Sequence, residues 1–216
     1  MTSGRAVLFD YDDTLVKTRQ CKFAAIQALA LRHYGVSLAV AQIEQHWGIP
    51  YRQLFARLFQ GLDADTERVI ARYEALNDEF PIVAYEDAAE TLEALLALGA
   101  LVGVVTSAGE IVRRQMVMLG LPLERLALLQ TASDTAHHKP DPRVFAPALQ
   151  RLSGRGVTPA QTAYVGDSLN DYRAARDAGL RFIGVHGRTT EAGEFARAGV
   201  KSIATLSELM QELWLR

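Results

Sequence analysis

The sequence contains a single cysteine, Cys21, among its 216 residues. One cysteine cannot form an intrachain disulfide, and it excludes the clustered cysteines of a structural zinc site. Apolar runs long enough to span a membrane are missing, and so is the basic segment followed by a long apolar core that marks a secretory signal. We therefore expect a cytoplasmic protein with no membrane partner.

An excess of charge of either sign is also lacking, with 23 Lys and Arg against 25 Asp and Glu. No basic surface of the kind that binds nucleic acid is predicted, so we expect no nucleic-acid partner. Low-complexity segments and internal repeats are absent. A hydrophobic content of 49% with 22% charged residues is ordinary for a globular enzyme. Composition leaves a monomer and a homodimer equally open.

Short apolar runs followed by polar residues or glycine predict buried strands. Runs of this kind are typical of parallel strands that are covered on both faces. Helical patterns lie between them, and this alternation predicts an α/β fold with a Rossmann-like parallel sheet flanked by helices. The strand candidates are residues 6–9, 101–105, 163–165 and 182–185, with a weaker one at 126–129. The helix candidates are residues 86–98, 110–119, 141–152, 168–178 and 207–215.

The segment that follows the first strand breaks this alternation. It shows only helical patterns, with no strand run between them. We predict an all-α insert at residues 16–83, and a Rossmann-like core formed by residues 1–15 and 84–216. The helical patterns of the insert are residues 17–34, 38–46, 53–59 and 66–80.

Polar residues follow the predicted strands at the points where the strands end. Asp10 and Asp12 follow the first strand, Thr106 and Ser107 follow the second, and residues 166–171 follow the run at 163–165. Ligands of open α/β sheets bind beyond the carboxyl ends of the strands. These segments are therefore predicted to form one site.

Four acidic residues, Asp10, Asp12, Asp167 and Asp171, would make this site rich in oxygen ligands. Such ligands suit Mg²⁺, and crowded carboxylates repel one another unless a cation is present. Asp167 and Asp171 also have other interpretations. Asp167 and Ser168 are also typical helix N-caps, and Asp171 is also typical of a solvated acid in a first helical turn. The two acids after the first strand favour the metal site.

Lys139 lies in a loop with two prolines, His137-His138-Lys139-Pro140-Asp141-Pro142. A lysine in a rigid loop before a helix can hold a phosphate or screen neighbouring carboxylates. A surface lysine is the alternative interpretation. The prolines favour a functional role because they preorganise the loop.

These segments together resemble the four motifs of the haloacid dehalogenase superfamily, in order and in spacing. The motifs are Asp10-Tyr11-Asp12-Asp13-Thr14, the strand ending at Thr106, Lys139 before Pro140, and Gly166-Asp167-Ser168-Leu169-Asn170-Asp171. The helical insert resembles the cap of the phosphoglycolate phosphatase-like and β-phosphoglucomutase-like branch. Asp13 departs from the glycine that many relatives have at this position.

The resemblance implies a phosphatase that acts through covalent catalysis. Asp10 would be the nucleophile that forms an aspartyl-phosphate, and Asp12 would protonate the leaving group and then deprotonate the attacking water. Thr106 would bind the transferring phosphoryl group, with Ser107 beside it. Lys139 would neutralise charge on the phosphoryl group and on Asp10.

The resemblance also implies a bound Mg²⁺. Asp167 would hold the ion together with Asp10 and the backbone carbonyl of Asp12, and Asp171 would support it directly or through water. The second aspartate of the first motif argues against a dehalogenase, because dehalogenases of this superfamily lack it.

A small phosphorylated metabolite is the expected partner, and the cap is expected to contact it. In the segment Trp47–Arg52, Arg52 is the candidate contact to an anionic leaving group, although a solvated arginine is an equal alternative. A phosphomutase or a phosphonate hydrolase stays open, but the latter needs a cap lysine, and only Lys17 and Lys22 lie in that region. A non-catalytic regulator that binds a phosphorylated metabolite is the alternative from another class.

Overall fold

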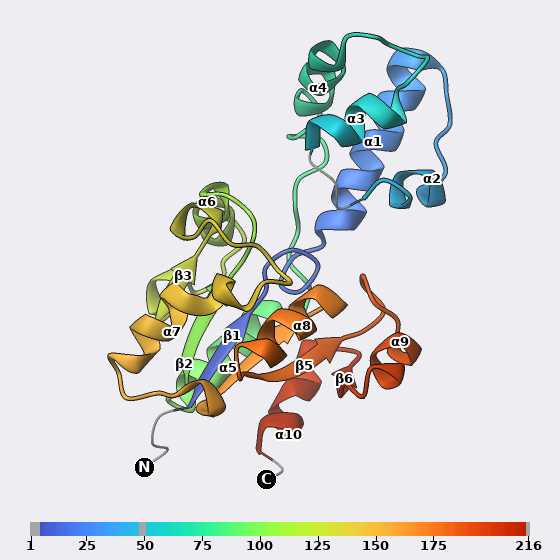
Figure 1. Ribbon diagram of the computed structural model, residues 1–216. Coiled ribbons are helices and arrows are strands. Elements are labelled where there is room, and N and C mark those ends of the chain that lie inside the picture. The colour runs from blue at the N-terminus through green and yellow to red at the C-terminus, as the bar shows by residue number, and fades with distance from the viewer. Residues whose placement is uncertain (1–4, 48–50, 215–216) are drawn as a thin grey trace. The chain divides into compact units, whose positions relative to one another are not determined.

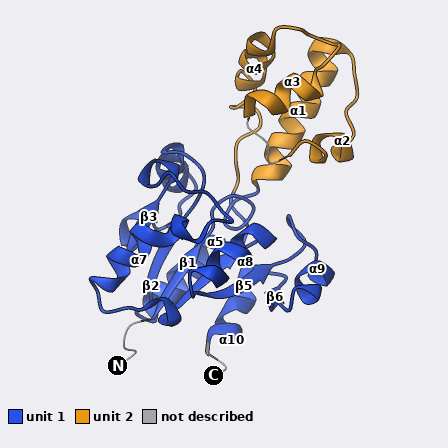
Figure 2. Cartoon of the chain, in the orientation of Figure 1, with its two compact units in different colours: residues 1–17, 84–216 blue, residues 18–83 orange. Residues whose placement is uncertain are grey.

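The computed structural model describes residues 5–47 and 51–214. The chain forms two compact units: unit 1 consists of residues 1–17 and 84–216, and unit 2 of residues 18–83 (Figure 2). Unit 1 alternates strands and helices, whereas the described elements of unit 2 are all helices. The predicted fold class, a Rossmann-like sheet with an all-α insert after the first strand, is confirmed.

Unit 1 is built on six parallel strands in the order β3-β2-β1-β4-β5-β6 (Figure 1). Chain order reverses between the neighbours β1 and β4, and ligands of doubly wound sheets bind at such a switch point. The register places Phe9 of β1 between Val104 and Val165. The strands are β1 (Ala6–Phe9), β2 (Leu101–Val105), β3 (Leu128–Gln130), β4 (Thr162–Gly166), β5 (Arg181–Val185) and β6 (Ser202–Ile203).

Helices cover the sheet and bury the apolar strands. Ala6 and Leu8 share one buried cluster with Ala148 and Ala174, which lie on the helices after β3 and β4. Val7 and the other odd-numbered residues of β1 point to the opposite face and are buried too. Burial on both faces explains why these strands are continuous apolar runs. The helices of unit 1 are α5 (Ala88–Ala97), α6 (Ile111–Met118), α7 (Ala146–Ser153), α8 (Leu169–Asp177), α9 (Ala192–Arg197) and α10 (Leu209–Trp214).

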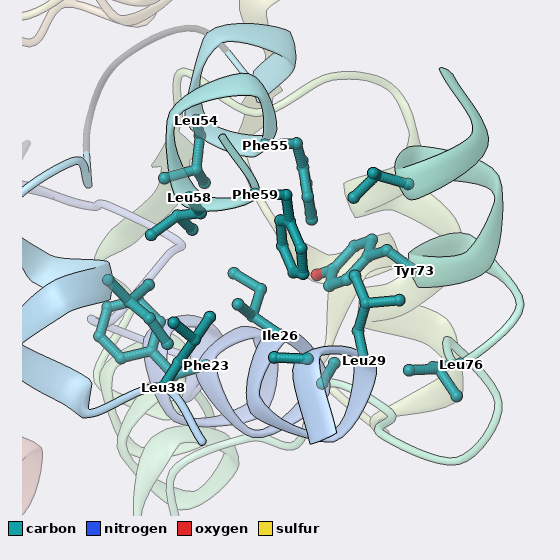
Figure 3. Close-up of a cluster of buried hydrophobic side chains, with 14 residues drawn as sticks. Phe23, Ile26, Leu29, Leu38, Leu54, Phe55, Leu58, Phe59, Tyr73 and Leu76 are labelled. Carbon is teal, nitrogen blue, oxygen red and sulfur yellow. The ribbon is translucent and has the colours of Figure 1, made fainter. Parts of the chain in front are cut away.

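Unit 2 has an apolar core of its own, shown in Figure 3. The rings of Phe55 and Tyr73 lie 4.8 Å apart, and Phe23 meets Trp47 edge to face at 4.8 Å. Trp47 therefore packs within the helical unit, and residues 48–50 of the predicted substrate segment lie outside the described residues. The helices are α1 (Thr18–Tyr34), α2 (Val40–Glu44), α3 (Tyr51–Leu58) and α4 (Thr66–Glu74).

The two segments that connect the units run side by side. Val16 forms an antiparallel bridge with Ala84, and the amide of Tyr85 donates to the carbonyl of Leu15 at 2.9 Å. The segment that leads into unit 2 and the segment that leads out of it are therefore hydrogen-bonded to each other within unit 1. Among residues 5–47 and 51–214, no helix is both long enough and apolar enough to cross a membrane.

Candidate active site

Asp10 is the first residue after β1, and the structure fixes it at the switch point. Its amide donates to the carbonyl of Val165 at 2.8 Å, which extends the pairing of β1 with β4. The chain then turns tightly, because the carbonyl of Tyr11 accepts the amides of residues 14, 15 and 16. This turn places Asp13 at φ 53°, in the left-handed region. The side chain of Asp10 is nine-tenths buried.

Lys139 links Asp10 to Asp171 through one buried ammonium group. Its Nζ lies 2.6 Å from Asp10 Oδ1 and 2.7 Å from Asp171 Oδ1. Burial alone would lower the pKa of Lys139, but the adjacent carboxylates of Asp10 and Asp171 raise it well above its usual range. The lysine is therefore held as a cation between two acids that lie far apart in the sequence.

Two buried residues with no role assigned from the sequence contact Lys139 and the helical segment that follows its loop. Gln130 ends β3, donates through Nε2 to the carbonyl of Val144 at 2.6 Å, and accepts the amide of Ala148 at 2.9 Å. The ring of Tyr164 lies 5.3 Å from Lys139 Nζ, within cation–π range. Neither residue carries a sequence signal, since Tyr164 lies within the strand run at 163–165 and Gln130 follows the weak strand candidate at 126–129.

Asp171 lies in the first turn of α8, where Ser168 is the N-cap. Ser168 Oγ accepts the amide of Asp171 at 3.1 Å, and Asp171 Oδ2 accepts the Ser168 amide at 3.0 Å and its hydroxyl at 2.5 Å. This is a capping box in which both reciprocal hydrogen bonds between side chain and backbone are formed. The capping interpretation is therefore right for Ser168, while the other oxygen of Asp171 faces Lys139.

Asp167 lies at the start of the same loop, 3% exposed. Thr14 donates through Oγ1 to Asp167 Oδ1 at 3.2 Å, and the side chain of Thr189 also donates to this carboxylate. Burial and, to a smaller extent, the nearby Asp171 together raise the pKa of Asp167 to about 7. Burial likewise raises the pKa of Asp10, against the lowering effect of Lys139.

The acidic cluster fits a divalent cation. Asp10, Asp167 and Asp171 each offer a carboxylate oxygen, and these three atoms lie within 4.8 Å of one another. All three residues are buried, so a cation held by their oxygens would favour the ionised forms that burial opposes. Hard oxygen donors of this kind suit Mg²⁺.

Thr106 completes the set of strand-end residues. It is 2% exposed, its amide donates to the carbonyl of Gln130 at 3.0 Å, and its Oγ1 accepts the amide of Ala108 at 3.0 Å. The amide of Thr106 and one lone pair of Oγ1 are already used in these hydrogen bonds. The hydroxyl group can therefore donate its proton to a bound group.

One cavity of about 240 Å³ brings these residues together. Of the residues that the sequence predicted, it is lined by Asp10, Asp12, Thr106, Ser107, Lys139, Asp167 and Asp171. Four further residues line the cavity and have no site role predicted from the sequence: Asp13, Ser168, Asn170 and Thr189. Three of these lie within the motifs quoted above, whereas Thr189 follows β5 in a segment with no motif.

Arg52 lies apart from this set, in unit 2. It is the second residue of α3, its side chain is 69% exposed, and it forms an ion pair with Glu67 of α4. This contact matches a solvated arginine at a helix start. Its role as a substrate contact stays a prediction.

The fold and the cavity together define a class of enzyme. A doubly wound parallel sheet carries, at its switch point, a buried aspartate beside a lysine, a threonine hydroxyl and further carboxylates. Enzymes of the α/β class perform hydrolysis and group transfer at this position.

Comparison with known proteins identifies the family within this class. Residues 7–185 match the model of the haloacid dehalogenase-like hydrolase family, and the chain belongs to this family. It is 32% identical over 196 residues to pyrophosphatase PpaX of Bacillus velezensis, covering 86% of this chain and 85% of that protein. It is 30% identical over 181 residues to a phosphoglycolate phosphatase of Xylella fastidiosa, covering 82% of this chain and 77% of that protein.

Solved structures agree with this assignment. A HAD family hydrolase from Deinococcus radiodurans, solved with bound phosphate and sodium, superposes with a TM-score of 0.82 at 25% identity. The match covers 99% of this chain and 96% of that one. The protein is therefore a hydrolase of the haloacid dehalogenase-like family, similar to enzymes named as phosphatases.

Proposed function

We propose that the protein is a Mg²⁺-dependent phosphatase that hydrolyses a small phosphate monoester through an aspartyl-phosphate on Asp10. The observation that carries the proposal is the position of Asp10, buried at the switch point with Lys139 Nζ at 2.6 Å. A carboxylate needs such a cation beside it to approach an anionic phosphoryl group without prohibitive repulsion.

In the first half of the reaction, a carboxylate oxygen of Asp10 attacks the phosphorus atom, and the bond from phosphorus to the leaving oxygen breaks. Asp12 gives its proton to that oxygen, so the leaving oxygen departs as a hydroxyl group and not as an oxyanion. Thr106 and Lys139 stabilise the charge on the non-bridging oxygens of the phosphoryl group.

In the second half, Asp12 accepts a proton from a water molecule that attacks the phosphorus atom of the aspartyl-phosphate. The bond between phosphorus and the Asp10 oxygen breaks, inorganic phosphate is released, and Asp10 returns to its carboxylate form. Asp12 is half-buried and lines the cavity, which suits a group that exchanges protons with both the leaving group and water.

The proposed Mg²⁺ would be held by Asp10, Asp167 and the backbone carbonyl of Asp12, and it would neutralise charge on the phosphoryl group. One carboxylate oxygen of Asp171 lies within 4.8 Å of an oxygen of Asp10 and an oxygen of Asp167. Its oxygens accept from Ser168 and face Lys139, which favours a supporting role over direct ligation.

The names of the relatives guide the choice of substrate. The pyrophosphatase and the phosphoglycolate phosphatase act, by name, on phosphate compounds whose leaving groups are small anions. We propose that the substrate of this chain is of the same kind. A phosphonate hydrolase is less favoured, because Lys17 and Lys22 are the only lysines of the region that would supply a Schiff base, and Lys17 is paired with Glu86.

A phosphate-release assay tests this proposal. Wild-type protein is incubated with pyrophosphate, phosphoglycolate, sugar phosphates and p-nitrophenyl phosphate, with Mg²⁺ or with EDTA. We expect Mg²⁺-dependent release with at least one compound, and loss of release in Asp10→Asn. Equal release by wild type and Asp10→Asn would refute the nucleophile, and full activity in EDTA would refute the metal.

A further inference from the structure

The loop after β5 reaches the active site, although it carries none of the recognised motifs. The amide of His186 donates to the carbonyl of Ile203 at 3.0 Å and anchors the loop to β6. Gly187 then adopts φ +77°, and its amide donates to the carbonyl of Thr190 at 3.0 Å. A tight turn of this kind requires glycine at the left-handed position. The turn presents Arg188 and Thr189 to the neighbouring loops.

Arg188 binds the turn that follows β1. Its Nη1 donates to the carbonyl oxygen of Thr14 and, at 3.4 Å, to that of Asp13. These two carbonyls directly follow Asp12, the proposed acid and base. The guanidinium group therefore restrains the backbone on the C-terminal side of a catalytic residue.

The same guanidinium group stacks on Tyr85, which belongs to the second connecting segment. The guanidinium carbon lies 3.4 Å from the centre of the Tyr85 ring. Arginine is suited to this geometry because its planar group can stack on a ring while its edge donates hydrogen bonds. One side chain thus contacts both segments by which unit 2 is attached, next to the bridge between Val16 and Ala84.

The contacts of Arg188 argue against a role in holding substrate. Among the described residues that line the cavity, Thr189 is present and Arg188 is not. Its Nη1 donates to backbone carbonyls, and its flat face is covered by a ring. An arginine that binds a phosphate instead directs its donors into the cavity.

We propose that Arg188 is a positioning residue that clamps the turn at residues 13–14 to Tyr85 and thereby fixes Asp12. The catalytic part of this inference rests on the proposed function, because it concerns the rate of the proposed reaction. The structural part does not, because the clamp restrains both connecting segments whether or not a substrate is present.

Substitution of Arg188 should have two separate effects, one on deuterium exchange and one on kcat. Arg188→Gln loses the stacking and the hydrogen bonds of Nη1, so the amides of Leu15 and Tyr85 should exchange with deuterium about tenfold faster or more, as their hydrogen bonds open more often. The same variant should lower kcat for p-nitrophenyl phosphate about tenfold or more, with KM changed less than about threefold, because Asp12 acts in the chemical step.

Arg181→Gln is the matched control. Arg181 begins β5, the strand that leads into the Arg188 loop, and it also donates to a backbone carbonyl, that of Glu212 at 2.8 Å, but at the other end of the strand. It should leave kcat and the exchange of residues 11–16 and 84–88 unchanged. Arg188→Lys keeps the charge without the planar fork, and we expect it to resemble Arg188→Gln rather than wild type.

The outcomes separate this inference from the proposed function. Faster exchange in Arg188→Gln, measured by mass spectrometry, supports the clamp even when the wild type releases no phosphate. Unchanged exchange overturns the clamp, and so does a loss that appears only in KM or equally in Arg181→Gln. Where Arg188→Gln does not fold, Tyr85→Leu removes the stacked ring alone and should accelerate exchange in the same two segments.

Discussion

Lys139 and Asp171 form a buried ion pair, with Nζ 2.7 Å from Oδ1, and this pair holds the ammonium group against Asp10. Asp171 is in turn fixed by the capping box at the start of α8. The position of the proposed nucleophile's counter-charge therefore depends on the first turn of a helix, through a residue that the sequence predicts as part of the metal site.

Removal of this counter-charge should damage both stability and activity. In Lys139→Met, Asp10 and Asp171 lose their buried partner, which costs about 3–5 kcal/mol for pairs of this kind. We expect phosphate release to fall about 10²-fold or more, because an oxyanion partner is lost as well. Urea unfolding and phosphate release measure the two effects.

Lys201→Met is the control for a lysine in an exposed ion pair. Lys201 pairs with Glu212, but its side chain is 60% exposed. Its loss should change the free energy of unfolding by less than about 1 kcal/mol and leave the rate unchanged. Equal effects of the two substitutions would mean that burial of the Lys139 pair has no energetic consequence.

Metal affinity should distinguish the two acids of the β4 loop. Asp167→Asn removes a proposed ligand, whereas Asp171→Asn removes a residue that faces Lys139. We expect Asp171→Asn to weaken Mg²⁺ binding about 10- to 100-fold, the size of an indirect effect, and Asp167→Asn to weaken it far more. Titration calorimetry with Mg²⁺ measures both. Equal losses would make Asp171 a direct ligand.

Most of the sheet could be predicted from sequence, because its strands are buried on both faces and appear as apolar runs. The exception is β6, which has only two residues, Ser202 and Ile203, and no apolar run. The weak candidate at 126–129 is a strand, but it lies at Leu128–Gln130. A strand at the edge of the sheet needs few apolar residues, so the pattern of apolar residues in the sequence does not predict it.

Helix boundaries were predicted less well, and proline gives one reason. The helix expected at 141–152 is a 3₁₀ turn, Pro142–Phe145, followed by α7. Pro147 lacks the amide for a bond to residue 143, so an α-helix cannot run continuously through it. The helix expected to continue to Phe80 ends at Glu74, and its later apolar residues, Leu76 and Phe80, pack against the core of unit 2 from a segment of turns.

The site residues were predictable where they follow strands and form motifs. Gln130, Tyr164 and Arg188 were not, since their roles depend on contacts between segments far apart in the chain. Tyr164 donates to the carbonyl of Val105, for example, at 3.0 Å across the sheet. Such partners are set by the packing of the fold, which a single sequence does not display.

Mg²⁺ binding should depend on pH through Asp167. Its pKa is about 7 in the folded protein against an ordinary 3.8, so the folded state binds the extra proton between these values. The contribution of Asp167 to the stability of metal-free protein should therefore fall as pH rises through this window and level off above about 7. Mg²⁺ competes with this proton, so its affinity should rise about tenfold per pH unit up to about pH 7.

Thermal unfolding between pH 5 and 8, with Mg²⁺ or with EDTA, checks this expectation. The stabilisation by Mg²⁺ should grow with pH, and the slope should be smaller in Asp167→Asn. A Mg²⁺ affinity that does not change below pH 7 would contradict the raised pKa of this carboxyl group.

Asp13 offers a test of the turn that carries the catalytic residues. Its φ of 53° disfavours most side chains, and alanine there costs about 1–2 kcal/mol relative to an allowed conformation. Glycine accepts this φ but loses about 0.5–1 kcal/mol through the entropy of the unfolded chain. Asp13→Gly should therefore be more stable than Asp13→Ala by a margin of about 1 kcal/mol or less.

Both substitutions remove the same carboxylate, so their difference in urea unfolding reports the backbone alone. Glu90, an exposed residue of α5, supplies the inverse case, because alanine is favoured over glycine within a helix by about 1 kcal/mol. The order of stability of the alanine and glycine variants should be opposite at positions 13 and 90. The same order at both positions would show that the turn after Asp12 does not hold residue 13 in the left-handed conformation, and the clamp by Arg188 would then lack the backbone geometry on which it depends.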